Sequence, residues 1–99
     1  MITIQIIAVG VFREIMQVGK TTMQFEKKLY PNLTINTVVD VLDRKYAGRF
    51  KKELFLQDGS RNEWTRIILN GRDIRFLPRE KLTVNDGDII LFSSVLAGG

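Results

Sequence analysis

Cysteine and histidine are both absent from this chain of 99 residues. Without them a protein has no disulfide framework, no zinc site of the usual ligands, no cysteine nucleophile and no histidine general base. The chain is therefore poorly equipped for catalysis. We expect a protein that is not itself an enzyme and that binds no metal or cofactor of its own.

Long apolar runs are also missing. No run approaches the roughly 18 apolar residues that a membrane span needs. The first residues, Met1 to Ile6, lack the basic start and the cleavage site of a signal peptide. With 44% apolar and 26% charged residues, the composition is that of an ordinary soluble domain. We therefore expect a cytoplasmic protein without contact to membranes.

Charge of one sign is only mildly in excess, because 15 basic residues face 11 acidic ones and leave a net charge of +4. Such an excess suits either nucleic acid or an acidic protein partner. Arg66, Arg72, Arg75 and Arg79 lie close together in the sequence, but no aromatic stacking platform for bases is evident among them. Direct binding of nucleic acid is therefore not expected, and a solvated charged face is the simpler interpretation.

The first half of the chain contains two strand patterns and one helix pattern. Residues 2–9 and 21–26 alternate between apolar and polar, which indicates two strands joined by a loop over 11–16. Thr34 is a suitable N-cap for a helix over about 35–47. The apolar positions of that helix recur at helical spacing: Ile35, Val38, Val39, Leu42 and Tyr46.

The second half is less regular. Residues 49–65 suggest a short helical turn, with Phe55 and Trp64 as packing residues. A buried strand over 66–69 then leads into the tight-turn dipeptide Asn70-Gly71 and a short strand or extended piece over 72–77. The last strand covers 89–95. The first and last strands are the most apolar, so they should be central and parallel to each other.

The end of the sequence is Leu96-Ala97-Gly98-Gly99. A Gly-Gly pair arises at such a place by chance about 0.5% of the time. Glycine has no Cβ, so this end can enter a narrow channel and present an unhindered carboxylate to another protein's active site. We therefore predict a domain over 1–95 that holds out a flexible tail over 96–99.

A strand pair, one helix and further strands before Gly-Gly resemble the ubiquitin-like β-grasp family. Asn70-Gly71 is similar to the "VNG" turn of its sulfur-carrier branch, and Asp86-Gly87-Asp88 to the "DGD" of that branch. The ending over 92–99 is similar to that of the ubiquitin-related modifier (Urm) family. The resemblance implies an α+β roll: a mixed sheet of about five strands with one main helix across one face.

The resemblance also implies a mechanism. The Gly99 carboxylate, next to Gly98, would be activated as an acyl-adenylate and converted to a thiocarboxylate, with Leu96 and Ala97 recognised as part of the tail. ATP and Mg²⁺ would be used by an E1-like adenylyltransferase (MoeB/ThiF-like). The sulfur donor would be a rhodanese or a cysteine desulfurase, and the product would serve tRNA thiolation by a thiolation enzyme, conjugation to target-protein lysines through an isopeptide bond, or both.

The partner surface should be the exposed side of the sheet near the tail. Ile68 precedes the Asn-Gly turn, where ubiquitin-like folds often expose an apolar residue, and Arg72 and Phe92 lie near it. In the last strand either Ile89 and Leu91 or Ile90 and Phe92 face outward, and sequence parity does not decide between these pairs.

Two other functions stay open at this point. A permanent small subunit of molybdopterin synthase (MoaD-like), donating sulfur to a pterin precursor, would share the same tail chemistry. However, such chains often have a proline-rich end, where this one has Ser93-Ser94-Val95. A basic RNA-binding module with an incidental tail is the third interpretation.

Overall fold

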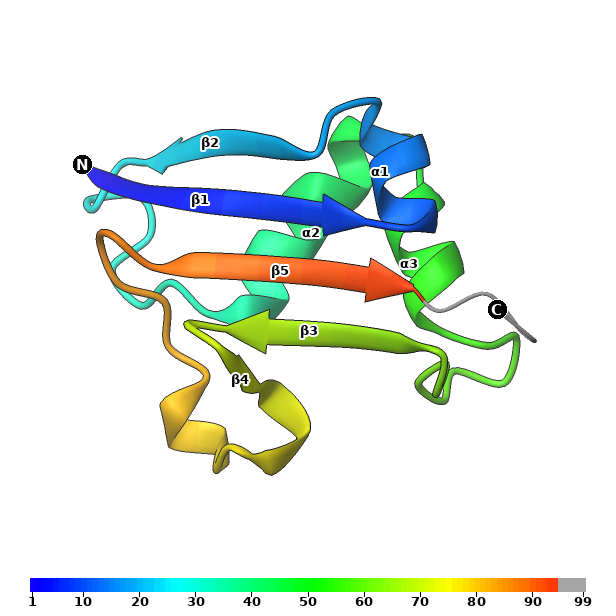
Figure 1. Cartoon of the computed structure of the whole chain (residues 1–99). Helices are drawn as coiled ribbons and strands as arrows, with labels where there is room; N and C mark the ends of the chain where they lie inside the picture. The colour runs from blue at the N-terminus through cyan, green and yellow to red at the C-terminus, as the bar shows by residue number, and fades with distance from the viewer. Residues whose placement is uncertain (95–99) are drawn as a thin grey trace.

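The computed structural model, which describes residues 1–94, is a five-stranded mixed sheet packed against three short helices (Figure 1). In sheet order the strands are β2 (Lys20–Phe25), β1 (Ile2–Val9), β5 (Ile89–Ser94), β3 (Thr65–Leu69) and β4 (Arg72–Asp73). The helices α1 (Val11–Met16), α2 (Ile35–Lys45) and α3 (Arg49–Leu54) all lie on one face of this sheet. The predicted β-grasp roll is thereby confirmed.

The two central strands are β1 and β5, and they run parallel, as their apolar sequences predicted. β1 pairs on its other side with β2, and β5 pairs with β3, both antiparallel. Because these two strands lie in the middle of the sheet and the helices cover one of its faces, their inward side chains are enclosed on all sides. Ile4 and Ile6 of β1 and Ile90 of β5 accordingly have no solvent exposure.

The helix α2 forms as its apolar spacing predicts. The Thr34 side chain accepts a hydrogen bond from the Thr37 backbone N–H at 3.3 Å, which caps the first turn. Val38 and Leu42 are fully buried against the sheet, one turn apart on the same face. After α2 the chain turns through Gly48, which has a left-handed φ of 83° and starts α3 directly.

The segment 11–16 is a helix, and the prediction of a loop there is wrong. Phe12, Ile15 and Met16 are all buried, and their offsets of three and four residues place them on one side of a helix. The segment is too short for this spacing to stand out from the sequence alone. Packing of Phe12 into the core stabilises a turn of helix that would not form in isolation.

Two further predictions need correction. Trp64, expected to pack, is 54% exposed, and Phe55 is 37% exposed. The extended piece predicted over 72–77 is a two-residue strand followed by a 3₁₀ helix over Ile74–Phe76. Asp73 causes the change, because its carboxylate accepts the Arg75 backbone N–H at 3.0 Å and bends the chain.

Among the helices of the described part, none combines the length and the apolar character needed to cross a membrane.

Candidate functional site

The candidate site begins where β5 ends, because this central strand leads to the last five residues of the sequence. Ser94, its final residue, pairs with Thr65 of β3, and both are buried. The Thr65 hydroxyl donates to the Asn62 carbonyl at 2.7 Å. The point from which the chain leaves the sheet is therefore held by the interior of the protein.

Two contacts fix Ser94 from outside the sheet. Its hydroxyl donates a hydrogen bond of 2.8 Å to the carboxylate of Glu53, which lies on α3, 41 residues earlier. Its carbonyl lies against Gly10, so close that a Cβ added at Gly10 would come within 2.3 Å of the Ser94 oxygen. A helix and a turn from distant parts of the sequence thus set the position of Ser94.

The tail residues predicted to carry the chemistry, Leu96, Ala97, Gly98 and Gly99, lie outside the described residues, as does the predicted boundary at 95.

The face of the sheet opposite the helices carries a row of apolar side chains. Cross-strand register aligns Ile7 of β1, Leu91 of β5 and Ile68 of β3, and all three are half-buried. Val9 and Ile89 flank this row and are 47% and 40% exposed. We call these five residues the open-face patch. It contains Ile68, which the sequence analysis predicted for the partner surface. Arg72, predicted there as well, is exposed, but it pairs with the buried Leu69 across β3 and β4, so it lies on the other side of this sheet edge.

Phe92 does not belong to this face, and its prediction as a partner-surface residue is corrected. Its side chain has no solvent exposure and packs against the rings of Phe12 and Phe50, with centroid distances of 5.6 and 5.2 Å. Alternation along β5 then sends Ile89 and Leu91 to the open face. The structure settles the choice that sequence parity left open.

The charged residues next to the open-face patch centre on Asp73. Arg75 donates to its carboxylate at 3.0 Å, and Arg66 lies 3.7 Å from the same oxygen. Burial raises the pKa of Asp73, but the hydrogen bonds and charge of Arg75, together with the charge of Arg66, outweigh burial and leave that pKa below its ordinary value. Asp73 is thus an ionised counter-charge for two arginines.

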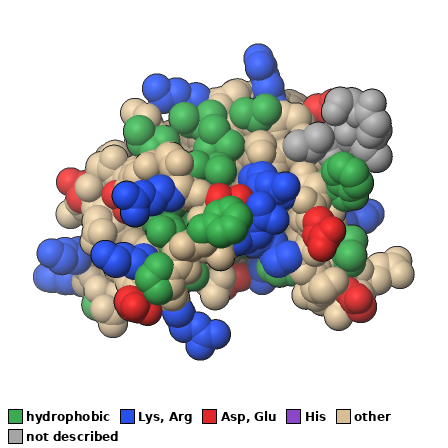
Figure 2. Space-filling model, turned by 60° about the horizontal axis from the view of Figure 1, so that its bottom comes forward, with side chains coloured by type: hydrophobic (Ala, Val, Ile, Leu, Met, Phe, Trp, Pro, Cys, Tyr) green, Lys and Arg blue, Asp and Glu red, His purple; other side chains and the backbone are tan. Residues whose placement is uncertain are grey.

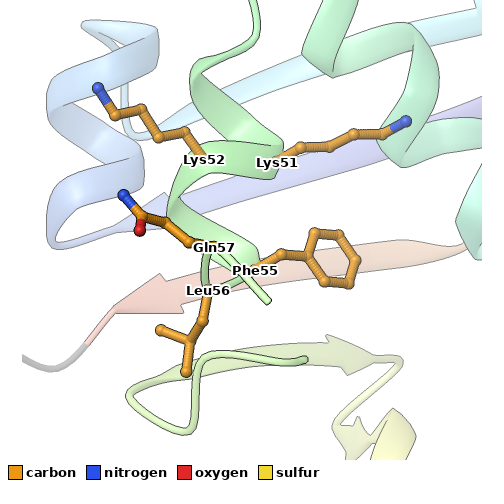
Figure 3. Close-up of a pocket in the computed structure, with 5 residues that line it drawn as sticks. All are labelled: Lys51, Lys52, Phe55, Leu56 and Gln57. Carbon is orange, nitrogen blue, oxygen red and sulfur yellow. The ribbon is translucent and has the colours of Figure 1, made fainter. Parts of the chain in front are cut away.

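A groove on the helical side is lined by Lys51, Lys52, Phe55, Leu56 and Gln57 (Figure 3). The five side chains diverge, and the two amines point in opposite directions. The Lys51 amine pairs with Asp40 at 2.6 Å, whose hydrogen bond raises the pKa of Lys51. These groups do not converge on a common point, so the groove does not assemble a reactive constellation.

Two pairs of aspartates are close enough in the sequence to suggest paired catalytic carboxylates, Asp40 with Asp43 and Asp86 with Asp88, but their side chains have structural partners. Asp86 accepts the Thr3 backbone N–H at 2.7 Å, and Asp88 accepts the Asn85 backbone N–H at 2.7 Å. Asp43 accepts the Lys51 backbone N–H at 2.8 Å. Within residues 1–94, His, Cys, Asp and Glu side chains form no cluster of three that could hold a metal ion.

Sequence reasoning missed Glu53, Gly10 and Ile7 as members of this site. Glu53 carries no local signal, because its partner Ser94 is distant in the sequence. Gly10 follows the predicted strand over 2–9, and nothing near it in the sequence indicates a contact with Ser94. Ile7 could have been found from the alternation of residues 2–9, since an apolar residue among the outward positions of a strand indicates a surface for contact.

The chain is similar to one protein family and to several solved structures. The family model described as Urm1 (Ubiquitin related modifier) matches residues 3–99. No curated protein matches the chain by sequence. Solved structures do match it in fold, each at an identity that shows the fold alone.

Three of these structures are informative. The HVO 2177 protein of Haloferax volcanii has a TM-score of 0.74 at 21% identity, over 99% of this chain and 87% of the other. The small archaeal modifier protein 1 (SAMP1) of Methanosarcina acetivorans has a TM-score of 0.72 at 21% identity, over 100% and 98%. A chain of the BexX/CysO complex of Amycolatopsis orientalis has a TM-score of 0.66 at 19% identity, over 97% and 99%.

Proposed function

The chain belongs to the Urm1 family of ubiquitin-related modifiers, and from this membership we propose that it is a protein modifier and sulfur carrier that is used through the carboxylate of Gly99. The match over residues 3–99, which includes the Gly-Gly end, carries the proposal. The fold supports it, since a central strand anchored at Ser94 leads directly toward that end.

The chemistry requires a partner that activates the tail. A free carboxylate is a poor acyl donor, because attack on it would expel an oxide. We propose that a Gly99 oxygen attacks the α-phosphorus of ATP in an E1-like adenylyltransferase (MoeB/ThiF-like), with Mg²⁺ bound there and pyrophosphate leaving. The product is an acyl-adenylate whose leaving group is AMP.

Sulfur then replaces this leaving group. A persulfide on a sulfur donor, such as a rhodanese or a cysteine desulfurase, attacks the Gly99 acyl carbon and expels AMP, which gives an acyl disulfide. A second thiol of the partner attacks the sulfur bound to the donor, releases the thiocarboxylate and forms a protein disulfide. In the other branch a target lysine amine attacks the activated acyl group and forms an isopeptide bond.

We propose that the activating partner docks on the open-face patch, with Arg66 at its rim and Arg72 at the neighbouring edge of the sheet. An apolar row beside a charged group has the composition of a protein interface core with a charged rim. The Amycolatopsis orientalis chain of similar fold forms a complex with BexX, so chains of this shape do assemble with a partner. We place the reaction in the cytoplasm, where tRNA thiolation and lysine conjugation find their substrates.

The test is the intact mass of the protein after incubation with ATP, Mg²⁺, a sulfide source and the host's activating enzyme. We expect a mass gain equal to the replacement of one oxygen by one sulfur. The control is the chain without Gly98 and Gly99, which should gain nothing. An unchanged mass under conditions in which a SAMP1 protein reacts would refute the proposal.

A second experiment separates the modifier from the synthase subunit. Conjugates on target lysines, with only transient binding to partners, are expected for a modifier. A stable complex with a pterin-processing enzyme, without conjugates, would instead favour the small subunit of molybdopterin synthase. Mass spectrometry of tagged protein recovered from the host's lysate distinguishes the two.

A further inference from the structure

Most of the net positive charge lies in one segment. Residues 61–81 contain six of the basic residues but only three of the acidic ones, so this fifth of the chain carries three of its four net charges. The segment runs from the turn before β3 through β4 to the second 3₁₀ helix, Arg79–Lys81, at one edge of the sheet. Figure 2 brings this edge forward and shows Lys and Arg side chains gathered beside hydrophobic ones.

Two aromatic rings are exposed in the same segment. Trp64 is 54% exposed and Phe76 is 81% exposed, the highest exposure among the large hydrophobic residues of the described chain. Burial of either ring would contribute about 2 kcal/mol or more to stability, so the fold forgoes this gain at both positions. Exposed rings of this size are typical of contact surfaces.

The structure brings both rings to the same arginine. Trp64, Arg66 and Arg75 line one small groove together with Glu63. The guanidinium of Arg75 also lies over the Phe76 ring, 5.6 Å from its centroid. Trp64 and Phe76 are 12 positions apart in the sequence, and the turn and the 3₁₀ helix after β3 join them around Arg75.

The carboxylates nearby do not neutralise this cluster. Asp73 is shared by Arg66 and Arg75. Arg61 lies in the same electrostatic environment: burial lowers the pKa of its guanidinium, Asp73 opposes that effect, and Arg75 and Arg66 add to it. Its buried Nε has no hydrogen-bond partner within residues 1–94. Asp73 is therefore shared by two guanidinium groups, and Glu63 is the other carboxylate residue of the groove. Against these two acidic residues stand Arg61, Arg66 and Arg75, which leaves an excess of positive charge for a polyanion.

Contrary to the expectation from the sequence, we propose that this surface, formed by Trp64, Phe76 and the arginines Arg61, Arg66 and Arg75, binds single-stranded nucleic acid. Phosphates would pair with the guanidinium groups, and unpaired bases would stack on the rings of Trp64 and Phe76. The site does not depend on the tail or on the sulfur-carrier function. The chain without Gly98 and Gly99 should bind as well as the full chain, which keeps the two proposals separately testable.

An acidic protein segment is the competing ligand, and the observations favour nucleic acid over it. A strand of nucleic acid presents anionic groups and flat rings in regular alternation, which matches arginines interspersed with exposed aromatic faces. An acidic protein segment needs the charges but not two separate rings, one of them almost fully exposed. The apolar row suited to a protein partner lies elsewhere, in the open-face patch.

The experiment uses the single tryptophan of the chain as its probe. The full-length protein is titrated with single-stranded RNA of about ten nucleotides, since such sites span roughly 4–16 nucleotides. We expect quenching of Trp64 fluorescence that saturates. Three phosphate contacts predict that log K falls with log salt at a slope of about −2. Duplex RNA of the same sequence should bind more weakly, and single-stranded DNA tests whether the ribose hydroxyl contributes.

Variants test the surface by anisotropy of labelled RNA, which does not need the tryptophan. Trp64→Ala should weaken binding by about 5- to 100-fold, the range for loss of one stacked base. Arg75→Gln should weaken it and reduce the salt slope. Lys27→Gln, which removes the same charge from an exposed residue between β2 and α2, is the matched control and should change neither.

Four outcomes would overturn the proposal. Saturable RNA binding without any change in Trp64 fluorescence would place the RNA elsewhere. Equal losses for Arg75→Gln and Lys27→Gln, or equal binding of base-free polyphosphate, would show that only net charge acts. Quenching by the activating enzyme but not by RNA would assign the surface to a protein partner. Circular dichroism of each variant verifies that the fold is intact.

Discussion

Gly10 shows how a single residue can control the site from a distance. Its backbone has a positive φ of 68°, and its Cα lies against the carbonyl of Ser94, the last residue of β5. No other residue type leaves room there, because the first atom of any side chain would meet a backbone oxygen. Gly10 therefore lets β5 pass over the start of α1.

The first prediction concerns Gly10→Ala. We expect the substitution to lower the free energy of unfolding by about 2–4 kcal/mol, because strain at positive φ adds to a clash with an atom that cannot rotate away. Urea denaturation measures this. It should also slow thiocarboxylate formation by displacing Ser94.

Gly59→Ala is the matched control, since Gly59 has a φ of 88° and no atom within 4 Å of the added Cβ. Gly59→Ala should lower the free energy of unfolding by only about 1 kcal/mol, because alanine is strained at this positive φ but meets no neighbouring atom. Equal losses at the two positions would show that the contact with Ser94 has no energetic weight.

At the scale of elements, the two turn motifs that pointed to the sulfur carriers hold each other in place. The Asn70 amide donates to Asp88 at 2.9 Å, and its oxygen accepts the Ile89 backbone N–H at 2.9 Å. Asp86 accepts the Thr3 backbone N–H. The β3–β4 turn is thus tied to the start of β5, and the loop before β5 to the start of β1, so these residues set the register of the central strands.

The second prediction concerns Asn70→Gly. Asn70 and Gly71 have φ values of 50° and 86°, which glycine adopts readily, so the turn itself should persist. The loss of two hydrogen bonds should lower the free energy of unfolding by about 1–3 kcal/mol. Thermal and urea denaturation measure it, and hydrogen exchange should increase first at Ile89.

The comparison needs Asp88→Asn alone and combined with Asn70→Gly. If the Asn70–Asp88 bond matters, the two substitutions should together cost less than the sum of their separate effects. Strict additivity would contradict the proposed link between the two turns.

At the scale of the whole molecule, the two faces of the sheet have different roles: one stabilises the fold and the other is available for binding a partner. One face packs under three helices and holds the core, whereas the other is open and carries the open-face patch (Figure 1). Adjacent residues of one strand therefore have opposite roles: Leu91 faces the open side and Phe92 the core.

The third prediction compares these two neighbours. Leu91→Lys should weaken binding of the activating enzyme by at least tenfold, because it places a charge in the middle of an apolar row, while unfolding should change by no more than about 1 kcal/mol. Phe92→Ala should destabilise the protein by about 3–5 kcal/mol. Calorimetric titration and urea denaturation supply the two values.

Unchanged affinity of Leu91→Lys for the enzyme would move the docking surface away from the open face. Lys20→Glu, at the β2 edge of the same row, serves as the control for charge alone. It should alter the salt dependence of binding more than its strength at high salt.

Much of the fold could be predicted from the sequence, because its signals are local. The alternation of residues 2–9, the helical spacing from Ile35 to Leu42, the Thr34 cap and the Asn70-Gly71 turn each depend on residues within about one turn or one strand. The helix over Val11–Met16 was missed because six residues are too few to show a period, and its stability comes from the burial of Phe12.

The candidate site was predictable only in part. Ile68 was placed on the open face from its position beside the turn, while Phe92 and Arg72 were assigned to the wrong side. An uninterrupted apolar strand such as Ile89-Ile90-Leu91-Phe92 has no alternation to reveal which side faces the helices. Trp64 was expected to pack because large aromatic residues usually do. The residues around it in the sequence give no sign of the exposed groove that it lines with Arg66 and Arg75.

The sequence by itself therefore determined the long strands, the main helix, the parallel central pair and the membership in a family that ends in Gly-Gly, because these follow from periodicity, turn chemistry and residue order. Only the tertiary structure decided which side of β5 is open, how Glu53 and Gly10 hold Ser94, and that two exposed rings share one arginine. Each of these depends on contacts between residues far apart in the chain, and their geometry is set by packing rather than by any local preference.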